Sequence, residues 1–392
     1  MGDGLTLREI ARLAKVSTAT VSRAINRVPT VNPVLARRIR KVIEKEGYFP
    51  NTNARALVHG RSRSFGLIVS EITNPFFPEI VQTFAKLGAQ HNYEILLSSI
   101  DHDPRLLEMA VRQMIERRVG GVAILTFGDE LPLIDVLTAR NVPVFVVDAD
   151  SSGPLLKTVQ IDYEHGIRQA VQHLAALGHE RIAFIGGPRD LKTATIRRSA
   201  VEKCMEEIGL ELRPELFVDG DHSIEAGMKA LPALAAMPDR PSAVLCSNDM
   251  TAIGVMRAAF DLCLNIPRDL SVVGFDDIKL AQFMTPPLTT VQMSQTEIAR
   301  LSFSALLDSL EPTRHGNGRQ MYSMKTNLIL RQSTALAPGC LVNRAATARS
   351  EVDMALKLAE KTRNDRNLRP LSRIEQDYSC SSAFSTGPTS IP

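Results

Sequence analysis

The 392-residue sequence lacks three features that would direct its interpretation elsewhere. Its five cysteines are scattered and form no CxxC pair, so neither a disulfide framework nor a zinc site is indicated. Its apolar runs are shorter than the 18 or so residues that a membrane span needs, and its first ten residues show no export signal. A nucleophile elbow, a Gly-rich phosphate loop and metal-ligand spacing are also missing. We therefore expect a cytoplasmic protein that is no enzyme and carries no metal or cofactor.

The length of the chain predicts two or three domains. The charge is unevenly distributed along it. The net charge of +3 combines +9 in residues 1–63 with −6 in the rest of the chain. A basic segment attached to an acidic body favours contact of that segment with a polyanion such as DNA.

The first 49 residues show the apolar spacing of three short helices. The first, "LREIARLA", follows Thr6, which is a candidate N-cap. The second is "TATVSRAIN" after Ser17, and the third runs from about Pro33 to Lys45. In the second helix Val21, Ala24 and Ile25 share one face, whereas Ala19, Ser22, Arg23 and Asn26 share the other. Small polar side chains and one arginine on an exposed helix predict a helix-turn-helix that reads base edges in the major groove.

Residues 50–63 contain a second candidate for DNA contact. The helical stretch 51–58, between Pro50 and Gly60, is too short to be stable alone in water. In this stretch Ala54 is small enough for a close approach to DNA, and the cationic Arg55 is long enough to reach a phosphate. A plain linker between domains is the alternative.

From residue 64 to 335, apolar strands alternate with amphipathic helices, which predicts an α/β core of two doubly wound lobes with parallel sheets. We expect the chain to cross between the lobes near residues 161–164, 290–293 and 318–325, with "PPLTTVQ" as a strand that returns to the first lobe. Residues 336–392 have a Ser-, Thr- and Pro-rich end, which we expect to be disordered.

Ligands of such folds bind at the carboxyl ends of the strands. Phenylalanine rings, carboxylates, an amide and an arginine follow the predicted strands, and together they suit a polyhydroxylated ring. The candidate ligand contacts are Asn74, Phe76, Phe77, Asp148, Arg197, Asn248 and Asp276. Each alone has a structural explanation, such as a helix cap or a core residue.

The stretches "LREIARLAKVSTATVSRAIN" and "GYFPNTNARAL" resemble the lactose-repressor (LacI/GalR) family of bacterial transcription regulators, and the resemblance runs from Leu5 to about Ser333. It implies base contacts from Thr18, Ala19 and Arg23, with phosphate or neighbouring contacts from Thr6, Leu7, Thr20, Ser22, Asn26 and Thr30. It also implies paired hinge helices through Ala54, Arg55 and Leu57, and the same sugar-contacting residues in the core. Met293 departs from the family where relatives often have glutamine, and Ala200 where they have glycine.

We therefore expect a dimeric regulator, associated with the nucleoid, that represses carbohydrate genes. Its partners would be a pseudo-palindromic operator and a sugar-like effector. A purine or other ring effector is the runner-up. A solute-binding protein for transport and an enzyme using Asp148 with Asp276 are weaker alternatives. The missing export signal and the basic head argue against the former.

Overall fold

The computed structural model describes residues 5–25, 30–48, 63–128, 131–150, 152–310 and 321–338. Hinge residues Ala54, Arg55 and Leu57, the predicted DNA contact Asn26 and most of the C-terminal tail lie outside these ranges. Within the described part of the chain, no helix has the length and hydrophobicity of a membrane span.

The head contains the three predicted helices, α1 (Leu7–Leu13), α2 (Thr18–Ile25) and α3 (Pro33–Glu46). Thr6 caps α1 in a reciprocal arrangement with Glu9, as its position predicts. The Ser17 hydroxyl accepts a hydrogen bond from Thr20 N at 3.1 Å at the start of α2. A small core of Ile10, Ala11, Ala14, Val21, Ala24 and Ile39 joins the helices.

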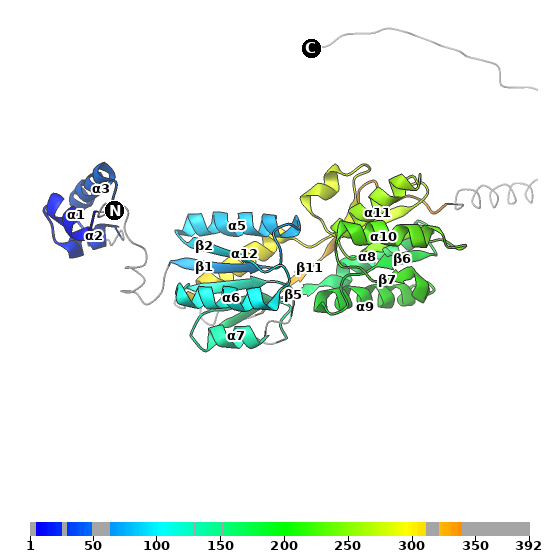
Figure 1. The fold of residues 1–392 in the computed structure, drawn as a ribbon, viewed down its shortest axis with the longest axis horizontal. Helices are drawn as coiled ribbons and strands as arrows, with labels where there is room; N and C mark the ends of the chain where they lie inside the picture. The colour runs from blue at the N-terminus through cyan, green and yellow to red at the C-terminus, as the bar shows by residue number, and fades with distance from the viewer. Residues whose placement is uncertain are drawn as a thin grey trace, which may run out of the picture. The chain divides into compact units, whose positions relative to one another are not determined.

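The first lobe is a six-stranded sheet in the order β11-β5-β4-β3-β1-β2 (Figure 1). Its strands are β1 (Ser64–Val69), β2 (Glu94–Ser99), β3 (Gly121–Leu125), β4 (Val144–Val147), β5 (Leu156–Asp162) and β11 (Met321–Lys325). Its helices are α5 (Phe76–His91), α6 (Pro104–Glu116), α7 (Leu131–Thr138) and α12 (Gln295–Leu310). On β1, Phe65 and Leu67 pack with residues of α5, whereas Ile68 packs with residues of α6, so both faces of the sheet are covered.

The second lobe is a six-stranded sheet in the order β12-β10-β9-β8-β6-β7. Its strands are β6 (Ile182–Ile185), β7 (Phe217–Val218), β8 (Ala243–Cys246), β9 (Ser271–Asp276), β10 (Thr289–Gln292) and β12 (Asn327–Ile329). Its helices are α8 (Tyr163–Ala176), α9 (Lys192–Glu207), α10 (Ile224–Ala235) and α11 (Asp249–Asp261), with the 3-10 turns η1 (Pro214–Leu216) and η2 (Lys279–Phe283). In the lobe, α8 packs against α9, and α10 packs against α11.

The two-lobed α/β architecture is confirmed, with three local differences. Strand β12 runs antiparallel to β10. Strand β2 is an edge strand and half-exposed, although its apolar sequence predicts a buried one. Strand β10 does not cross to the first lobe: it lies between β9 and β12, and the chain crosses just after it, at the start of α12.

Two further crossings between the lobes can be located along the chain. β5 ends in the first sheet at Asp162, and α8 begins the second lobe at Tyr163. Thr326 separates β11 in the first sheet from β12 in the second. Beyond β12 the chain stays attached to the second lobe as far as Ala337, which is buried and donates its N–H to Leu177 O at 2.9 Å. The second lobe therefore includes residues 336 and 337.

Candidate functional site

Helix α2 presents two unlike faces. Val21 and Ala24 are buried in the head core, whereas Thr18, Ala19 and Arg23 are exposed, and Thr20 and Ser22 are half-exposed. Thr6 and Thr30 are also exposed, but Leu7 packs against the head core. The Thr6 hydroxyl is used in the cap of α1. The exposed face of α2 thus carries the residue types that the sequence predicts for base contacts.

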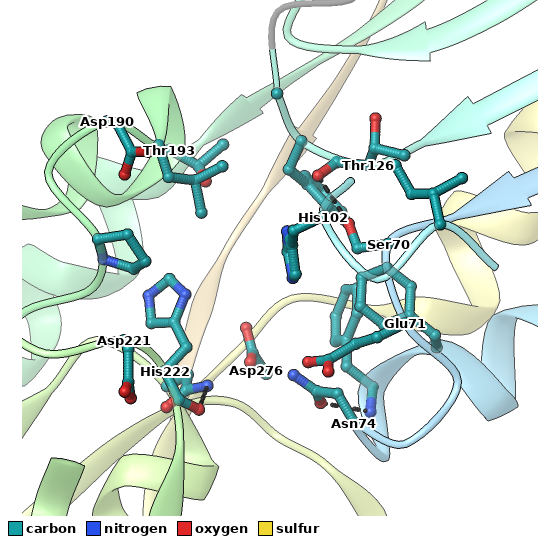
Figure 2. A pocket seen from close by; sticks show the side chains of 18 of the residues that line it. Ser70, Glu71, Asn74, His102, Thr126, Asp190, Thr193, Asp221, His222 and Asp276 are labelled. Carbon is teal, nitrogen blue, oxygen red and sulfur yellow. Dashed lines mark hydrogen bonds between the residues drawn. The ribbon is translucent and has the colours of Figure 1, made fainter. Parts of the chain in front are cut away.

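A cleft of about 350 Å³ opens between the two lobes (Figure 2). Six of the seven predicted ligand residues line it: Asn74, Phe76, Phe77, Arg197, Asn248 and Asp276. They follow or end strands β1, β6, β8 and β9, so strand ends of both lobes meet at one place. Met293 also lines the cleft.

The first-lobe wall of the cleft is largely aromatic. Phe76 and Phe77 meet edge to face with their ring centroids 5.3 Å apart, and Phe127 lies 5.8 Å from Phe76. Asn74 turns the chain into α5, because its Oδ1 accepts a hydrogen bond from Phe76 N at 3.1 Å. A wall of this kind fits the flat face of a ring.

The second-lobe wall is polar and centres on Arg197 and Asp276. The Arg197 guanidinium lies 4.0 Å from the Phe275 ring centroid, and its Nη1 donates to Ser247 O at 2.5 Å. Its Nη2 is 3.5 Å from Asp276 Oδ1. Even so, Arg197 Nε and Asp276 Oδ1 are buried without a hydrogen-bond partner in the described residues. Buried polar atoms of this kind are costly unless a ligand or water pairs with them.

Burial changes the protonation of two groups in this wall. The pKa of Asp276 is raised to about 7 because burial disfavours the carboxylate, although the Arg197 charge partly opposes the change. The pKa of His222 is lowered to about 3, mainly by burial and further by the nearby Arg197 charge, so its imidazole is neutral.

Asp148 does not line this cleft. It lies in an adjoining cavity of about 350 Å³, together with Asp150, Asp190 and Lys192. Its Oδ1 accepts from Ile161 N at 2.8 Å, and its Oδ2 accepts from the Tyr163 hydroxyl at 2.7 Å. Both oxygens therefore already have internal partners. Burial raises the pKa of this carboxyl as well.

Asn248 combines its place in the cleft with a structural role. It caps α11 by accepting from Thr251 N at 2.9 Å, and its Nδ2 donates to His222 O at 2.9 Å. The side chain thus fixes the backbone that carries His222 into the cleft.

Sequence reasoning missed several polar residues in the cleft. Figure 2 shows them around the same opening: Ser70, Glu71, His102, Thr126, Asp190, Thr193, Asp221 and His222. Most follow strands β1, β2, β3, β6 or β7 within a few residues. Applying the strand-end rule to every strand would have found them. Among the described residues, no group of His, Cys, Asp and Glu is arranged to hold a metal ion.

A basic three-helix head followed by a two-lobed α/β core with a ligand-sized cleft defines a class: DNA-binding regulators with a periplasmic-binding-protein-like core. The family model for bacterial regulatory proteins of the lacI family matches residues 6–51, and that for a periplasmic binding protein-like domain matches residues 171–334. The transcriptional repressor CytR of Escherichia coli (strain K12) is 34% identical over 335 residues, which cover 85% of this chain and 97% of CytR. The chain belongs to the lacI family of transcriptional regulators.

Three further similarities agree with this assignment. The ribose operon repressor of Escherichia coli (strain K12) is 31% identical over 310 residues, which cover 79% of this chain and 94% of that protein. The crystal structure of the lac repressor dimer bound to operator and the anti-inducer ONPF superposes with a TM-score of 0.75 at 26% identity, covering 85% of this chain and all of that chain. The CelR–cellobiose complex has a TM-score of 0.62 at 27% identity, covering 84% of this chain and 99% of that chain.

Proposed function

We propose that this regulator acts in the cytoplasm as a homodimeric repressor of carbohydrate genes, and that an uncharged, polyhydroxylated ring compound bound in the cleft controls its affinity for DNA. The observation that carries the proposal is the pairing of an aromatic wall with unsatisfied buried polar atoms. Phe76, Phe77 and Phe127 offer a surface for a ring. Asp276 Oδ1 and Arg197 Nε have no hydrogen-bond partner among the described residues.

The hydrogen-bonding complement favours hydroxyl groups on the ligand. Carboxylate oxygen accepts hydrogen bonds and guanidinium nitrogen donates them, and a sugar hydroxyl can satisfy either. The acidic side chains Glu71, Asp190, Asp221 and Asp276 line the cleft with one arginine, so an anionic ligand would meet net repulsion. Relatives include a ribose operon repressor and a regulator solved with cellobiose. These observations support a sugar or sugar derivative.

A purine or other aromatic ring compound is the second candidate, because three phenylalanine rings meet on one wall of the cleft. Stacking on such a wall is available to a nucleobase as well as to the face of a sugar. In either case we propose binding without chemical conversion of the ligand.

On the DNA side, we propose that two heads read the two halves of a pseudo-palindromic operator. One head offers few base contacts, and pairing doubles them. A dimer on its operator is the state in which the related lac repressor was solved. Thr18, Ala19 and Arg23 would contact bases, and Asn26, Ala54, Arg55 and Leu57 would extend the contact at positions that the structure does not describe.

A thermal-shift screen of monosaccharides, disaccharides, sugar phosphates and nucleobases tests the ligand proposal. We expect stabilisation by a neutral sugar and none by its phosphate ester. Arg197→Ala should abolish that stabilisation, and Lys203→Ala, a change on the same helix outside the cleft, should not. Stabilisation by nucleobases alone would favour the second candidate, and stabilisation by sugar phosphates would contradict the charge argument.

A further inference from the structure

Asp276 lies in an unfavourable backbone conformation. It ends β9 with a φ of 106°, and the next residue, Asp277, has a φ of 56°. Non-glycine residues avoid positive φ, and such a conformation persists only where the surroundings enforce it. The carboxylate that faces the cleft therefore depends on groups that hold its backbone.

Second-lobe residues hold the far side of this turn. Asp249 Oδ2 accepts from Ile278 N at 2.8 Å. One carboxylate oxygen of Asp277 accepts a hydrogen bond from Arg331 Nη2 at 2.6 Å, and the other accepts one from Gln292 Nε2 at 2.8 Å. These contacts keep the turn within its own lobe. The Asp276 carbonyl itself accepts a long hydrogen bond from Met293 N at 3.4 Å, in the segment between β10 and α12.

The Asp276 carbonyl is held from the other lobe. Gln295 is the first residue of α12 and is 94% buried, with a relative exposure of 6%; its Nε2 donates to Asp276 O at 2.8 Å. Helix α12 packs against α5 in the first lobe. A single side chain thus joins the backbone of the cleft carboxylate to a helix of the opposite lobe.

The next residue reaches the aromatic wall. Thr296 Oγ1 donates to Glu79 Oε1 at 3.3 Å, and Glu79 lies in the first turn of α5, which begins with Phe76 and Phe77. Two adjacent residues at the start of α12 therefore contact the elements that form both walls of the cleft.

We infer that Gln295 is a positioning residue for ligand binding: it holds Asp276 in its cleft-facing conformation and couples that residue to the first lobe through α12. The inference rests on the proposed function only in assigning a ligand contact to Asp276. A shift of the Asp276 backbone on ligand binding would then act directly on the start of α12.

Hydrogen exchange measured by mass spectrometry on the full-length protein tests the coupling without ligand or operator. Gln295→Met keeps the length of the side chain and removes the donor. We expect exchange to become about 5–10-fold faster, the equivalent of one net hydrogen bond, both in peptides spanning residues 272–279 and in those spanning 295–300. Gln169→Met is the control, because Gln169 Oε1 accepts a main-chain hydrogen bond from Leu328 N at 2.8 Å away from Asp276. It should change neither segment.

A second readout separates positioning from general stability. In protein labelled with ¹³C at the aspartate carboxyl, the Asp276 signal is the one that Asp276→Asn removes. Gln295→Met should move the titration midpoint of that signal, because the burial of the Asp276 carboxyl and its distance from Arg197 both change. Gln169→Met should leave the midpoint unchanged. If Gln295→Met cannot be purified, Gln295→Glu, which is ionised and cannot donate at neutral pH, serves in both measurements.

Faster exchange in only one of the two segments, an unmoved midpoint, or equal effects of Gln169→Met would overturn the inference. Because none of these results depends on a bound ligand or on DNA, the inference can fail while the proposed function stands. A failed ligand screen would likewise leave it intact.

Discussion

Asp276 links burial and protonation in the wall of the cleft, at the scale of a single residue. Its pKa is raised to about 7, so the folded state holds the proton more tightly than the unfolded chain does. The stabilisation that follows is fully present below the ordinary carboxyl pKa and is lost as pH rises through about 7. In the absence of ligand, ionised Asp276 therefore destabilises the fold above neutral pH.

This gives a prediction for the unliganded protein. Between pH 6 and pH 8, the thermal stability of the unchanged protein should fall relative to that of Asp276→Asn, because asparagine has no charge to gain. Parallel melting temperatures of the two proteins across this range would contradict the raised pKa. Asp269→Asn is a useful control, because that half-buried carboxyl is paired with Arg268 and its pKa is lowered.

The residues that line the cleft were predictable from the sequence to the extent that they follow strands. Asn74, Asn248 and Asp276 could be located because each lies at a strand end, and parallel strands end at one edge of a sheet. Asp148 also lies at a strand end, but the rule does not tell which carboxylate is already occupied. Its partners Ile161 and Tyr163 come from the crossing between the lobes, whose geometry no local pattern specifies.

Helix α2 has a testable role at the scale of an element. Arg23→Ala should cost about 1–3 kcal/mol of discrimination at one or two base pairs, because a bidentate contact to guanine is lost. Arg40→Ala on α3, also exposed, should weaken binding by similar amounts for all sequences. Binding-site selection with each variant distinguishes these outcomes. If Arg23→Ala left the base preference unchanged at every position, Arg23 would not take part in base recognition.

Gly166, in α8, packs tightly against the segments in which the chain crosses between the lobes. A Cβ atom there would lie 2.4 Å from Val291 Cγ1 and 3.0 Å from the Thr326 backbone carbon. The Gly166 N–H also donates to Thr326 Oγ1 at 3.0 Å. This glycine therefore allows α8 to approach the third crossing closely.

Gly166→Ala should lower the free energy of unfolding by about 1–3 kcal/mol, because overpacking forces backbone to shift. Gly153→Ala is the matched control, since no atom lies within 4 Å of a Cβ at that position. Urea denaturation of both variants measures the difference. Equal midpoints would show that the crossing tolerates an added methyl group.

The strands and helices were largely predictable because apolar periodicity is a local property. The structure differs from the prediction where the position of a strand in its sheet depends on neighbouring strands. Strand β2 is as apolar as its fellows but has an edge position, and β10 belongs to the second sheet because β9 and β12 pair with it on both sides. Pairing partners far apart in the chain cannot be read from the strand itself.

At the scale of the whole molecule, an ion pair between Lys192 and Asp150 bridges the lobes beside the cleft. Lys192 Nζ, on α9 of the second lobe, donates to Asp150 Oδ1 at 3.0 Å and to Asp148 O at 3.2 Å, both after β4 of the first lobe. Because the Asp150 side chain is 84% exposed, the pair adds little to overall stability. Its effect should appear in the balance between open and closed lobes.

Lys192→Met should reduce affinity for a ligand identified by the thermal-shift screen by up to about fivefold, with a nearly unchanged melting temperature of the unliganded protein. Lys203→Met is the control, since Lys203 pairs with Glu164 within the second lobe. Calorimetric titration of the three proteins tests this. Unaltered affinity with Lys192→Met would indicate that the bridge does not favour the ligand-bound arrangement.

The late position of β11 and β12 in the chain has a consequence for biosynthesis. Each closes one sheet at its edge, and both follow every other strand in order of translation. The head is contiguous within the first 48 residues, so it can form its core early as the chain emerges from the ribosome. The first lobe cannot complete its sheet until residue 325 has emerged, and the second lobe cannot until residue 329 has. Premature termination before residue 321 would leave an open edge on each sheet, which invites aggregation.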